Sequence, residues 1–344
     1  MKAAIFEKPY KFNIVDIEIP LPRKNEVLVK VMSVGICGSD MGPYTGKDME
    51  RRQPGIIMGH EAAGIVEALG EDVTLWKAGD RVAINPQIYC ENCLFCKIGA
   101  NNLCDNMLLI GSSKRKFLNG AMCEYICISE KQLLKLPESV SFDEGALLDP
   151  LGNAIRVVRK GNVGIGDNVV VIGCGTIGLM ILQIARLAGA AKVVAVSRSK
   201  TKEKLALDIG ANYYVSLDNK EKALEEINTI TNGKGPDVVI DAAGFSNTYD
   251  FAVSCCKKGG KIVALGYNGT NLDFPITKLI FKEIQLLGST GFAEESSMVF
   301  DYISNGKIKL DKIITNKFPL EQTQKAFEAV HNGSEIKVII NPGK

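Results

Sequence analysis

The fold is decided by residues 168–178, which read Asn168-Val-Val-Val-Ile-Gly-Cys-Gly-Thr-Ile-Gly178. The four apolar residues at 169–172 are typical of a strand buried on both faces of a parallel sheet. The next six residues fit G-x-G-x-x-G and open an apolar helix over 179–187. After a strand and before a helix, these glycines permit a tight turn, close approach of a pyrophosphate and helix–strand packing. The segment predicts a dinucleotide site; the alternative is a purely structural glycine-rich turn.

The same strand–helix alternation continues downstream. Further apolar strands are predicted at 192–196, 213–215, 237–240, 261–265 and 283–288, with helices at 202–209 and 220–231. Six strands alternating with helices are the pattern of a doubly wound parallel sheet. We therefore predict an α/β Rossmann domain over residues 151–290.

The flanking segments have a different pattern. Short apolar runs at 27–34, 62–68 and 81–84, separated by Gly, Pro and Asp, predict a β-rich domain in residues 1–150. After 290 the chain predicts helices at 297–304 and about 320–331, and a strand at 336–340.

Composition excludes several classes of protein. A length of 344 residues favours two domains, and 46% hydrophobic with 23% charged residues is typical of a soluble globular protein. The net charge of +2 argues against a strongly basic nucleic-acid binder. No signal-peptide core and no run of 18 apolar residues is found, so we expect neither secretion nor membrane insertion.

Four of the ten cysteines form a cluster, Cys90-x2-Cys93-x2-Cys96-x7-Cys104. In a long chain without a signal peptide, such a cluster favours a metal site over disulfides and is consistent with a cytoplasmic protein. Four thiolates satisfy tetrahedral Zn²⁺ and leave no open position, so the predicted role is structural. An iron–sulfur cluster is the alternative.

Two further motifs, Cys37-Gly-Ser-Asp40 and Gly59-His60-Glu61, complete a recognisable set. With the cysteine cluster, the glycine fingerprint and the domain order, the chain resembles the zinc-dependent medium-chain dehydrogenase/reductase family over its whole length. The branch it is most similar to includes polyol, butanediol, sugar-alcohol-phosphate and threonine dehydrogenases. The resemblance implies a GroES-like catalytic domain (1–150 and 291–344, with a zinc lobe at about 88–106), and a catalytic zinc in the cleft beside the Rossmann domain.

The resemblance also implies a ligand set for a catalytic zinc. Cys37 and His60 match the first two ligands of the family. Polyol and threonine dehydrogenases have a further acid in the segment here reading Leu147-Leu-Asp-Pro-Leu-Gly-Asn153, so Glu61 and Asp149 are the third and fourth candidates, one of which could bind through water. The alternative for Asp149 is a helix cap or turn. Two zinc ions per chain are expected.

Two polar residues next to Cys37 have implied catalytic roles. Ser39 matches the relay hydroxyl that accepts the alcohol proton, and Asp40 would orient the imidazole of His60. A local turn hydrogen bond is the alternative for both.

The residue after the second Rossmann strand selects the cofactor. An Asp or Glu usually binds the ribose 2′-hydroxyl of NAD there, whereas this chain has Ser197 and Arg198, with Lys202 close behind. A guanidinium can bind a 2′-phosphate, which favours NADP; alternatively Arg198 only covers the adenine and NAD binds. The remaining predicted cofactor residues are Gly173, Gly175, Thr176, Ile177, Gly178, Leu265 and Ser289.

The substrate is predicted only as a class. A secondary alcohol such as a polyol, diol or sugar alcohol is favoured, and the basic run Lys114-Arg115-Lys116 could bind a substrate phosphate or be a solvated loop. Gly291 stands where sorbitol-type members have an arginine. Threonine oxidation, a non-catalytic NADP(H) sensor and, remotely, a nucleic-acid-binding zinc ribbon are the alternatives; the resemblance implies a homo-oligomer.

Overall fold

The computed structural model describes residues 1–267 and 271–343 and divides into two units. The first comprises Met1–Pro150, Ser296–Ser304 and Ile313–Lys344, and the second comprises Leu151–Glu295 and Asn305–Lys312. Relative to the predicted domain ranges, residues 291–295 and 305–312 pack with the second unit. Among the described residues, no helix is long and apolar enough to cross a membrane.

The second unit is the predicted doubly wound sheet. Its elements are α4 (Leu148–Gly161, which begins in the first unit), β10 (Asn168–Ile172), α5 (Thr176–Leu187), β11 (Lys192–Ser197), α6 (Glu203–Ile209), β12 (Tyr213–Ser216), α7 (Lys220–Ile230), β13 (Val238–Asp241), α8 (Ser246–Cys255), β14 (Lys261–Ala264), α9 (Ile276–Phe281) and β15 (Gln285–Gly288). Among the described residues, six strands pair in parallel in the order β12-β11-β10-β13-β14-β15. This order places the carboxyl end of β10 where the chain changes direction across the sheet, which is where such folds bind ligands.

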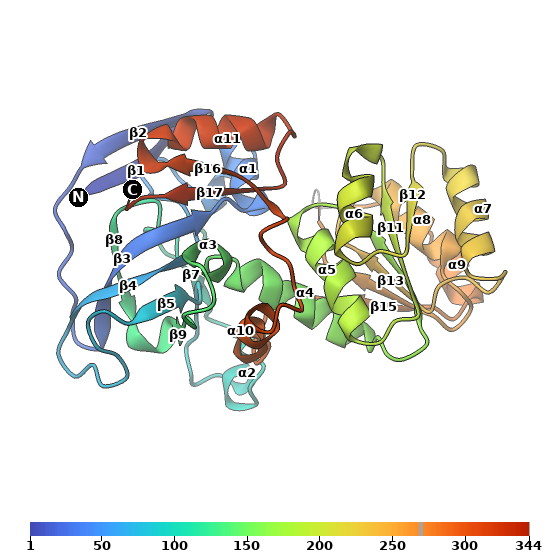
Figure 1. Ribbon diagram of the computed structural model, residues 1–344, viewed down its shortest axis with the longest axis horizontal. Helices are drawn as coiled ribbons and strands as arrows, with labels where there is room; N and C mark the ends of the chain where they lie inside the picture. Colours follow the sequence, from blue (N-terminus) through green and yellow to red (C-terminus); the bar gives the residue numbers. More distant parts are fainter. Residues whose placement is uncertain (268–270, 344) are drawn as a thin grey trace. The chain divides into compact units, whose positions relative to one another are not determined.

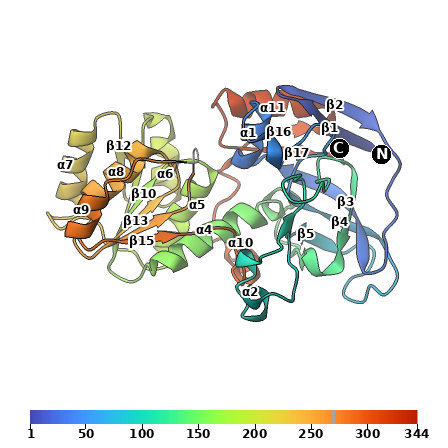
Figure 2. The ribbon, with the colours of Figure 1, turned by 180° about the vertical axis from the view of Figure 1, so that it is seen from behind.

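Both faces of this sheet are covered, which explains the continuous apolar run at 169–172. Helices α5 and α6 pack on one face (Figure 1), and α7 and α8 pack together on the other (Figure 2). Val169–Val171 are fully buried and Ile172 is nearly so. Helix α5 begins at Thr176 rather than at the predicted 179, because Gly175 already acts as its N-cap.

The first unit is the predicted β-rich domain. Its elements are β1 (Lys2–Lys8), β2 (Lys11–Asp16), β3 (Glu26–Gly35), α1 (Gly38–Tyr44), β4 (Glu61–Leu69), β5 (Arg81–Ile84), β6 (Gln87–Ile88), α2 (Leu94–Lys97), β7 (Leu108–Leu109), β8 (Tyr125–Ser129), β9 (Leu133–Lys135), α3 (Phe142–Gly145), α10 (Ser296–Ser304), β16 (Ile314–Pro319), α11 (Thr323–His331) and β17 (Lys337–Asn341).

The sheet of the first unit joins the two ends of the chain. Its order is β16-β17-β3-β4-β5-β9, with β8 pairing β3 as well, and α11 packs against β2, β16 and β17 (Figure 1). Gly35 of β3 pairs with Glu61 of β4 on one side and with Ile339 of β17 on the other. Residues after 330 therefore lie beside the two motifs that contain Cys37 and His60.

Candidate metal centres and cofactor site

Cys37, His60 and Glu61 form a compact group in the first unit. Cys37 is the N-cap of α1, directly after β3, and Glu61 begins β4. Since Gly35 and Glu61 are paired across β3 and β4, the strand register brings the two motifs together. The ligand atoms of Cys37, His60 and Glu61 all lie within 4.8 Å of one another.

Two glycines leave space for this group. A Cβ atom on Gly35 would overlap Oε2 of Glu61, so the absence of a side chain there lets the carboxylate reach the site. Gly59 has a φ of +94°, and a Cβ atom would crowd Val34 and Met122. The glycine of the Gly-His-Glu motif is therefore required by the backbone turn that presents His60.

Lys337, which the sequence did not single out, pairs with Glu61. Its side chain is almost fully buried, and Nζ donates to Glu61 Oε2 at 2.6 Å and to the carbonyl oxygen of Ile36 at 2.8 Å. Burial alone would lower the pKa of Lys337, but the nearby Glu61 and Cys37 raise it above its ordinary value. Lys337 therefore remains charged and occupies one oxygen of Glu61.

Asp40 contacts both ligand-bearing segments. Its Oδ2 accepts a hydrogen bond from the backbone N–H of Cys37 at 3.1 Å, and Oδ1 lies 3.6 Å from Nδ1 of His60. This leaves Nε2 as the ring nitrogen available to a metal. A second unexpected residue, Arg52, donates to Oδ1 from Nε at 3.2 Å and from Nη2 at 3.1 Å.

Asp149 and Ser39 lie outside the compact group. Asp149, in the first turn of α4, is close enough to interact electrostatically with His60 and Glu61, and burial raises its pKa to about 6. Its carboxylate does not belong to the set of atoms within 4.8 Å. Ser39 is half-buried in the first turn of α1, two residues after Cys37.

The charges of this group fit a divalent cation. Arg52 offsets the charge of Asp40 and Lys337 offsets that of Glu61, while Cys37 and Asp149 add two further groups that can carry negative charge. In the protein alone, burial and the neighbouring Glu61 and Asp40 raise the pKa of Cys37 well above its ordinary value. A bound divalent ion reverses this effect, because a coordinated thiol is deprotonated. The S, N and O donors match those of catalytic zinc sites.

The four predicted cysteines form a second group. The Sγ atoms of Cys90, Cys93, Cys96 and Cys104 lie within 4.8 Å of one another, with Cys93–Cys96 at 3.5 Å and Cys90–Cys96 at 4.0 Å. Bonds of about 2.3 Å to a tetrahedral zinc place sulfur atoms about 3.8 Å apart. Backbone N–H groups of Asn92 and Cys93 lower the pKa of Cys90 to about 6, which favours the thiolate that metals bind.

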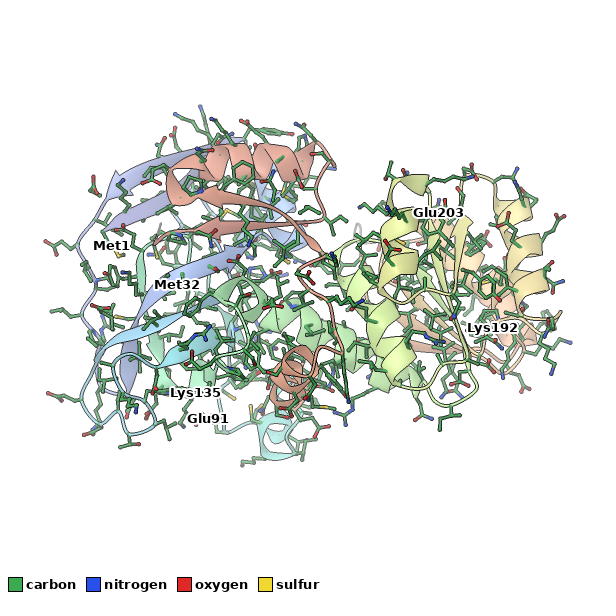
Figure 3. The ribbon with its side chains drawn as sticks, viewed as in Figure 1. Met1, Met32, Glu91, Lys135, Lys192 and Glu203 are labelled. Atoms are coloured by element: carbon green, nitrogen blue, oxygen red, sulfur yellow. The ribbon has the colours of Figure 1, made fainter. Side chains whose placement is uncertain are left out.

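The cysteine lobe, residues 88–106, is held by two cations. Lys131 pairs with Glu91, labelled in Figure 3, at 2.7 Å. Arg115 donates to the carbonyl oxygens of Asp105 at 2.6 Å and Met107 at 3.3 Å.

The basic run Lys114-Arg115-Lys116 is partly engaged by the protein itself. Lys114 pairs with Glu50 at 3.1 Å. Two residues of the basic run thus have protein partners, which favours its interpretation as a structural loop.

A cavity of about 220 Å³ opens in the second unit at the carboxyl ends of β10 and β11. Gly173, Gly175, Ser197, Arg198 and Lys202 line it, as predicted for a dinucleotide site. Gly173 has a φ of +100°, and a Cβ atom on Gly178 would overlap the carbonyl oxygen of Gly173. Nothing lies within 4 Å of a Cβ atom on Gly175, so its backbone faces open space at the N-terminus of α5.

The other predicted cofactor residues lie at neighbouring strand and helix ends. Thr176 and Ile177 form the first turn of α5, and Leu265 follows β14. Ser289 follows β15, and its Oγ is buried without a hydrogen-bond partner among the described residues. An unpartnered hydroxyl at this position is available to a ligand.

Asp241, which the sequence analysis did not single out, holds a loop that lines the cavity. This fully buried residue ends β13 and accepts hydrogen bonds from Ala243 N at 2.7 Å, Gly244 N at 2.9 Å and Thr248 Oγ1 at 2.6 Å. It thereby fixes the loop from which Ala243, Phe245, Asn247 and Thr248 line the cavity. A polar residue ending the apolar run at 238–240 was the available signal.

Comparison with known proteins identifies the family of the chain. Residues 23–138 match the alcohol dehydrogenase GroES-like domain, and residues 176–305 match the zinc-binding dehydrogenase domain. The chain belongs to the zinc-dependent medium-chain dehydrogenase/reductase family. It is an NAD(P)-dependent alcohol dehydrogenase of the branch that contains polyol and threonine dehydrogenases.

Individual relatives cover almost all of this dehydrogenase. Sorbitol dehydrogenase of Bacillus subtilis (strain 168) is 31% identical, covering 100% of this chain and 98% of the relative. L-threonine 3-dehydrogenase of the same strain is 33% identical, covering 98% of both. The crystal structure of a putative zinc-binding dehydrogenase from Sinorhizobium meliloti 1021, bound to NADP, has a TM-score of 0.89 at 30% identity, covering 99% of each chain.

Proposed function

We propose that this dehydrogenase oxidises a secondary hydroxyl of a polyol or sugar alcohol to the ketone, or performs the reverse reduction. The observation that carries the proposal is the grouping of Glu61 with Cys37 and His60. Asp149, buried near His60 and Glu61, is the further acid that the resemblance implies for the polyol and threonine branch. The relatives named as sorbitol dehydrogenase and L-threonine 3-dehydrogenase define the two substrate classes to compare.

The test is a substrate screen that follows the absorbance of reduced nicotinamide. Polyols of four to six carbons, their phosphates, 2,3-butanediol and L-threonine are each offered with NAD⁺ and NADP⁺. We expect the highest kcat/KM with an unphosphorylated polyol or diol, since Lys114 and Arg115 already have protein partners. A kcat/KM for L-threonine above that for every polyol would contradict the proposal.

In the proposed mechanism, Cys37 and His60 hold the catalytic zinc with Glu61 or Asp149. When bound, the metal supplies Lewis-acid stabilisation of the alcohol oxygen while hydride passes to the nicotinamide. Ser39, beside Cys37, receives the hydroxyl proton and passes it outward. Asp40 Oδ1 and Arg52 Nη2 both lie near Nδ1 of His60, at 3.6 and 3.4 Å, so Nε2 is the ring nitrogen that would bind the metal. Lys337 neutralises one oxygen of Glu61 and restrains its reach.

For the cofactor, we propose NADP over NAD. No carboxylate lines the cavity at the end of β11, where Ser197 and Arg198 stand instead. Arg198 is exposed at this edge, so its guanidinium is available to a 2′-phosphate. Ser289 Oγ, which lacks a partner, is proposed to contact the cofactor as well.

For metal content, we propose two zinc ions per chain. The second is structural and binds the cysteine lobe, whose four sulfurs leave no open coordination position. None of the ten cysteines, all of which the structure describes, forms a disulfide, which fits a reducing compartment, and we propose the cytoplasm.

For assembly, we propose self-association through β15. Among the described strands, β15 ends the parallel sheet, and Leu286 is 45% exposed; Ile280 and Phe281 of the preceding helix α9 are exposed as well. An edge strand with apolar side chains pairs readily with a second copy related by a two-fold axis. Sedimentation of Leu286→Lys tests this proposal: a lower mass than that of the wild type is expected, and an unchanged mass would contradict it.

A further inference from the structure

Arg52 is a buried arginine whose position the family motifs do not explain. It follows the 3₁₀ turn Met49–Arg51, and its side chain is 2% exposed, one of the largest fully enclosed side chains in the described chain. A guanidinium this deeply buried is costly unless it is paired and hydrogen-bonded. Its partners therefore indicate what the residue does.

The guanidinium is held on three sides. Nη1 donates to the carbonyl oxygen of Arg51 at 3.1 Å, which fixes the plane of the group. Nε and Nη2 both donate to Oδ1 of Asp40, at 3.2 and 3.1 Å. Nη2 also lies 3.4 Å from Nδ1 of His60. Asp40 itself is fully buried, so Arg52 is its charge partner.

Asp40 contacts both motifs that supply the proposed metal ligands. Its Oδ2 accepts the backbone N–H of Cys37, while Oδ1 faces both Arg52 and the ring of His60. The position of Asp40 Oδ1 decides how close it lies to Nδ1 of His60, and therefore whether it can accept a hydrogen bond from that nitrogen. That position is set by the fork of the Arg52 guanidinium, because the fork approaches Oδ1 with two N–H groups.

We propose that Arg52 is a positioning residue of the catalytic metal site, which acts through Asp40 to orient His60 and Cys37 for zinc. The inference rests on the proposed function, since it takes Cys37 and His60 as metal ligands. Groups that orient metal ligands typically contribute 10- to 100-fold to metal affinity. The proposal goes beyond the role of Asp40, because Arg52 fixes the Asp40 carboxylate, which in turn orients the His60 imidazole.

The test compares Arg52→Met and Arg52→Lys with wild type in the full-length enzyme. Zinc affinity is measured by competition with a chelator, and cobalt(II) is substituted so that its visible absorption reports the coordination geometry. The cysteine lobe provides an internal reference, because it binds its own ion in the same molecule. We expect the catalytic site to lose roughly 10- to 100-fold in affinity in Arg52→Met, with an altered cobalt spectrum. Arg52→Lys should lose less, since it keeps the charge but not the fork.

Arg81→Met is the matched control. Arg81 is also a largely buried arginine of the first unit, bonded to Glu138 and to the carbonyl oxygen of Val140, and it does not contact the metal ligands. Its variant should lose thermal stability and keep both metal affinities. If Arg52→Met or, should that variant not fold, Arg52→Lys retains wild-type affinity and cobalt spectrum, Arg52 is only a structural ion pair and the inference is wrong. A wild type that binds one zinc, at the lobe alone, would instead overturn the proposed function.

Discussion

At the scale of single residues, the proposed cofactor preference depends on the charge of one side chain, and the proposed proton transfer depends on one hydroxyl group. Ser197 and Arg198 stand at the end of β11, in the position that discriminates NADP from NAD, and both line the cavity. Ser39 stands beside Cys37 in the first turn of α1. Each position can therefore be tested by a change that leaves the backbone untouched.

Replacing Arg198 should remove the preference for NADP⁺. Charge-assisted hydrogen bonds to the 2′-phosphate contribute about 1.5–3 kcal/mol, which corresponds to roughly 10- to 150-fold in kcat/KM. Arg198→Ala should lose most of this preference, and Ser197→Asp should reverse it by placing a carboxylate against the phosphate. Steady-state kinetics with both cofactors measure the change.

The control for this prediction is Lys200→Ala, an exposed cation that does not line the cavity. It should leave the cofactor ratio unchanged. If the wild type prefers NAD⁺ and Arg198→Ala weakens both cofactors equally, the guanidinium only covers the adenine.

Ser39→Ala should lower kcat by roughly 10²-fold, because a positioned acid–base group typically contributes this much to proton transfer. Cofactor affinity and zinc content should remain those of the wild type. The measurement is kcat with the best alcohol found in the screen, with Ser139→Ala as the control, since that hydroxyl bonds only to Ser304 in the same unit. An unchanged kcat would assign Ser39 to a local turn.

At the scale of elements, the dinucleotide site is produced by the junction of β10 and α5. At this junction Gly173 has a positive φ, and Gly175 has open space where a side chain would lie. Gly178 packs against the carbonyl oxygen of Gly173. Gly175 and Gly178 differ in what surrounds them, so substitutions at the two positions distinguish an effect on folding from an effect on cofactor binding.

Gly178→Ala should destabilise the second unit, since its Cβ would overlap the carbonyl oxygen of Gly173, a backbone atom that has little freedom to move. Overpacking of this kind costs about 1–3 kcal/mol. Gly175→Ala should keep the fold but lose cofactor affinity, because its Cβ enters the open space that the pyrophosphate would occupy. Thermal unfolding and NADPH titration distinguish the two variants. Equal thermal stability of both variants would contradict this account.

At the scale of the whole molecule, the two candidate metal sites draw on chain segments of very different separation. The lobe cysteines lie within residues 90–104, whereas the second group combines Cys37 with His60 and Glu61, and Asp149 at the start of α4 lies outside it. We therefore expect the two ions to be lost independently.

Metal analysis should give about two zinc ions per chain. Asp149→Ala should lose about one and keep the lobe ion, whereas Cys93→Ser should lose the lobe ion and lower the thermal stability of the first unit, since structural zinc contributes folding free energy. A wild type with one zinc and a catalytic group unable to bind more would refute the catalytic assignment. Retention of both ions in Asp149→Ala would show that Glu61 is sufficient beside Cys37 and His60.

The sequence by itself predicted the fold class, the glycine fingerprint and the cysteine cluster, and the family resemblance implied the candidate catalytic ligands. The glycine fingerprint and the cysteine cluster were accessible because each lies in one continuous segment: Gly173–Gly178 follows its strand directly, and Cys90–Cys104 spans a single lobe. Within such a segment, backbone geometry converts spacing into position without reference to the rest of the chain.

Only the tertiary structure decided how the sites are supported. Lys337 reaches Glu61 because β17 and β4 both pair with β3, an arrangement that no spacing in the sequence specifies. The partners of Arg52, Asp241 and Arg115, which are Asp40, a loop backbone and the cysteine lobe, were likewise known only from the fold. The physical reason is the same for all four: a buried or bridging charge is defined by partners from other segments, and strand register and loop paths bring those partners within reach.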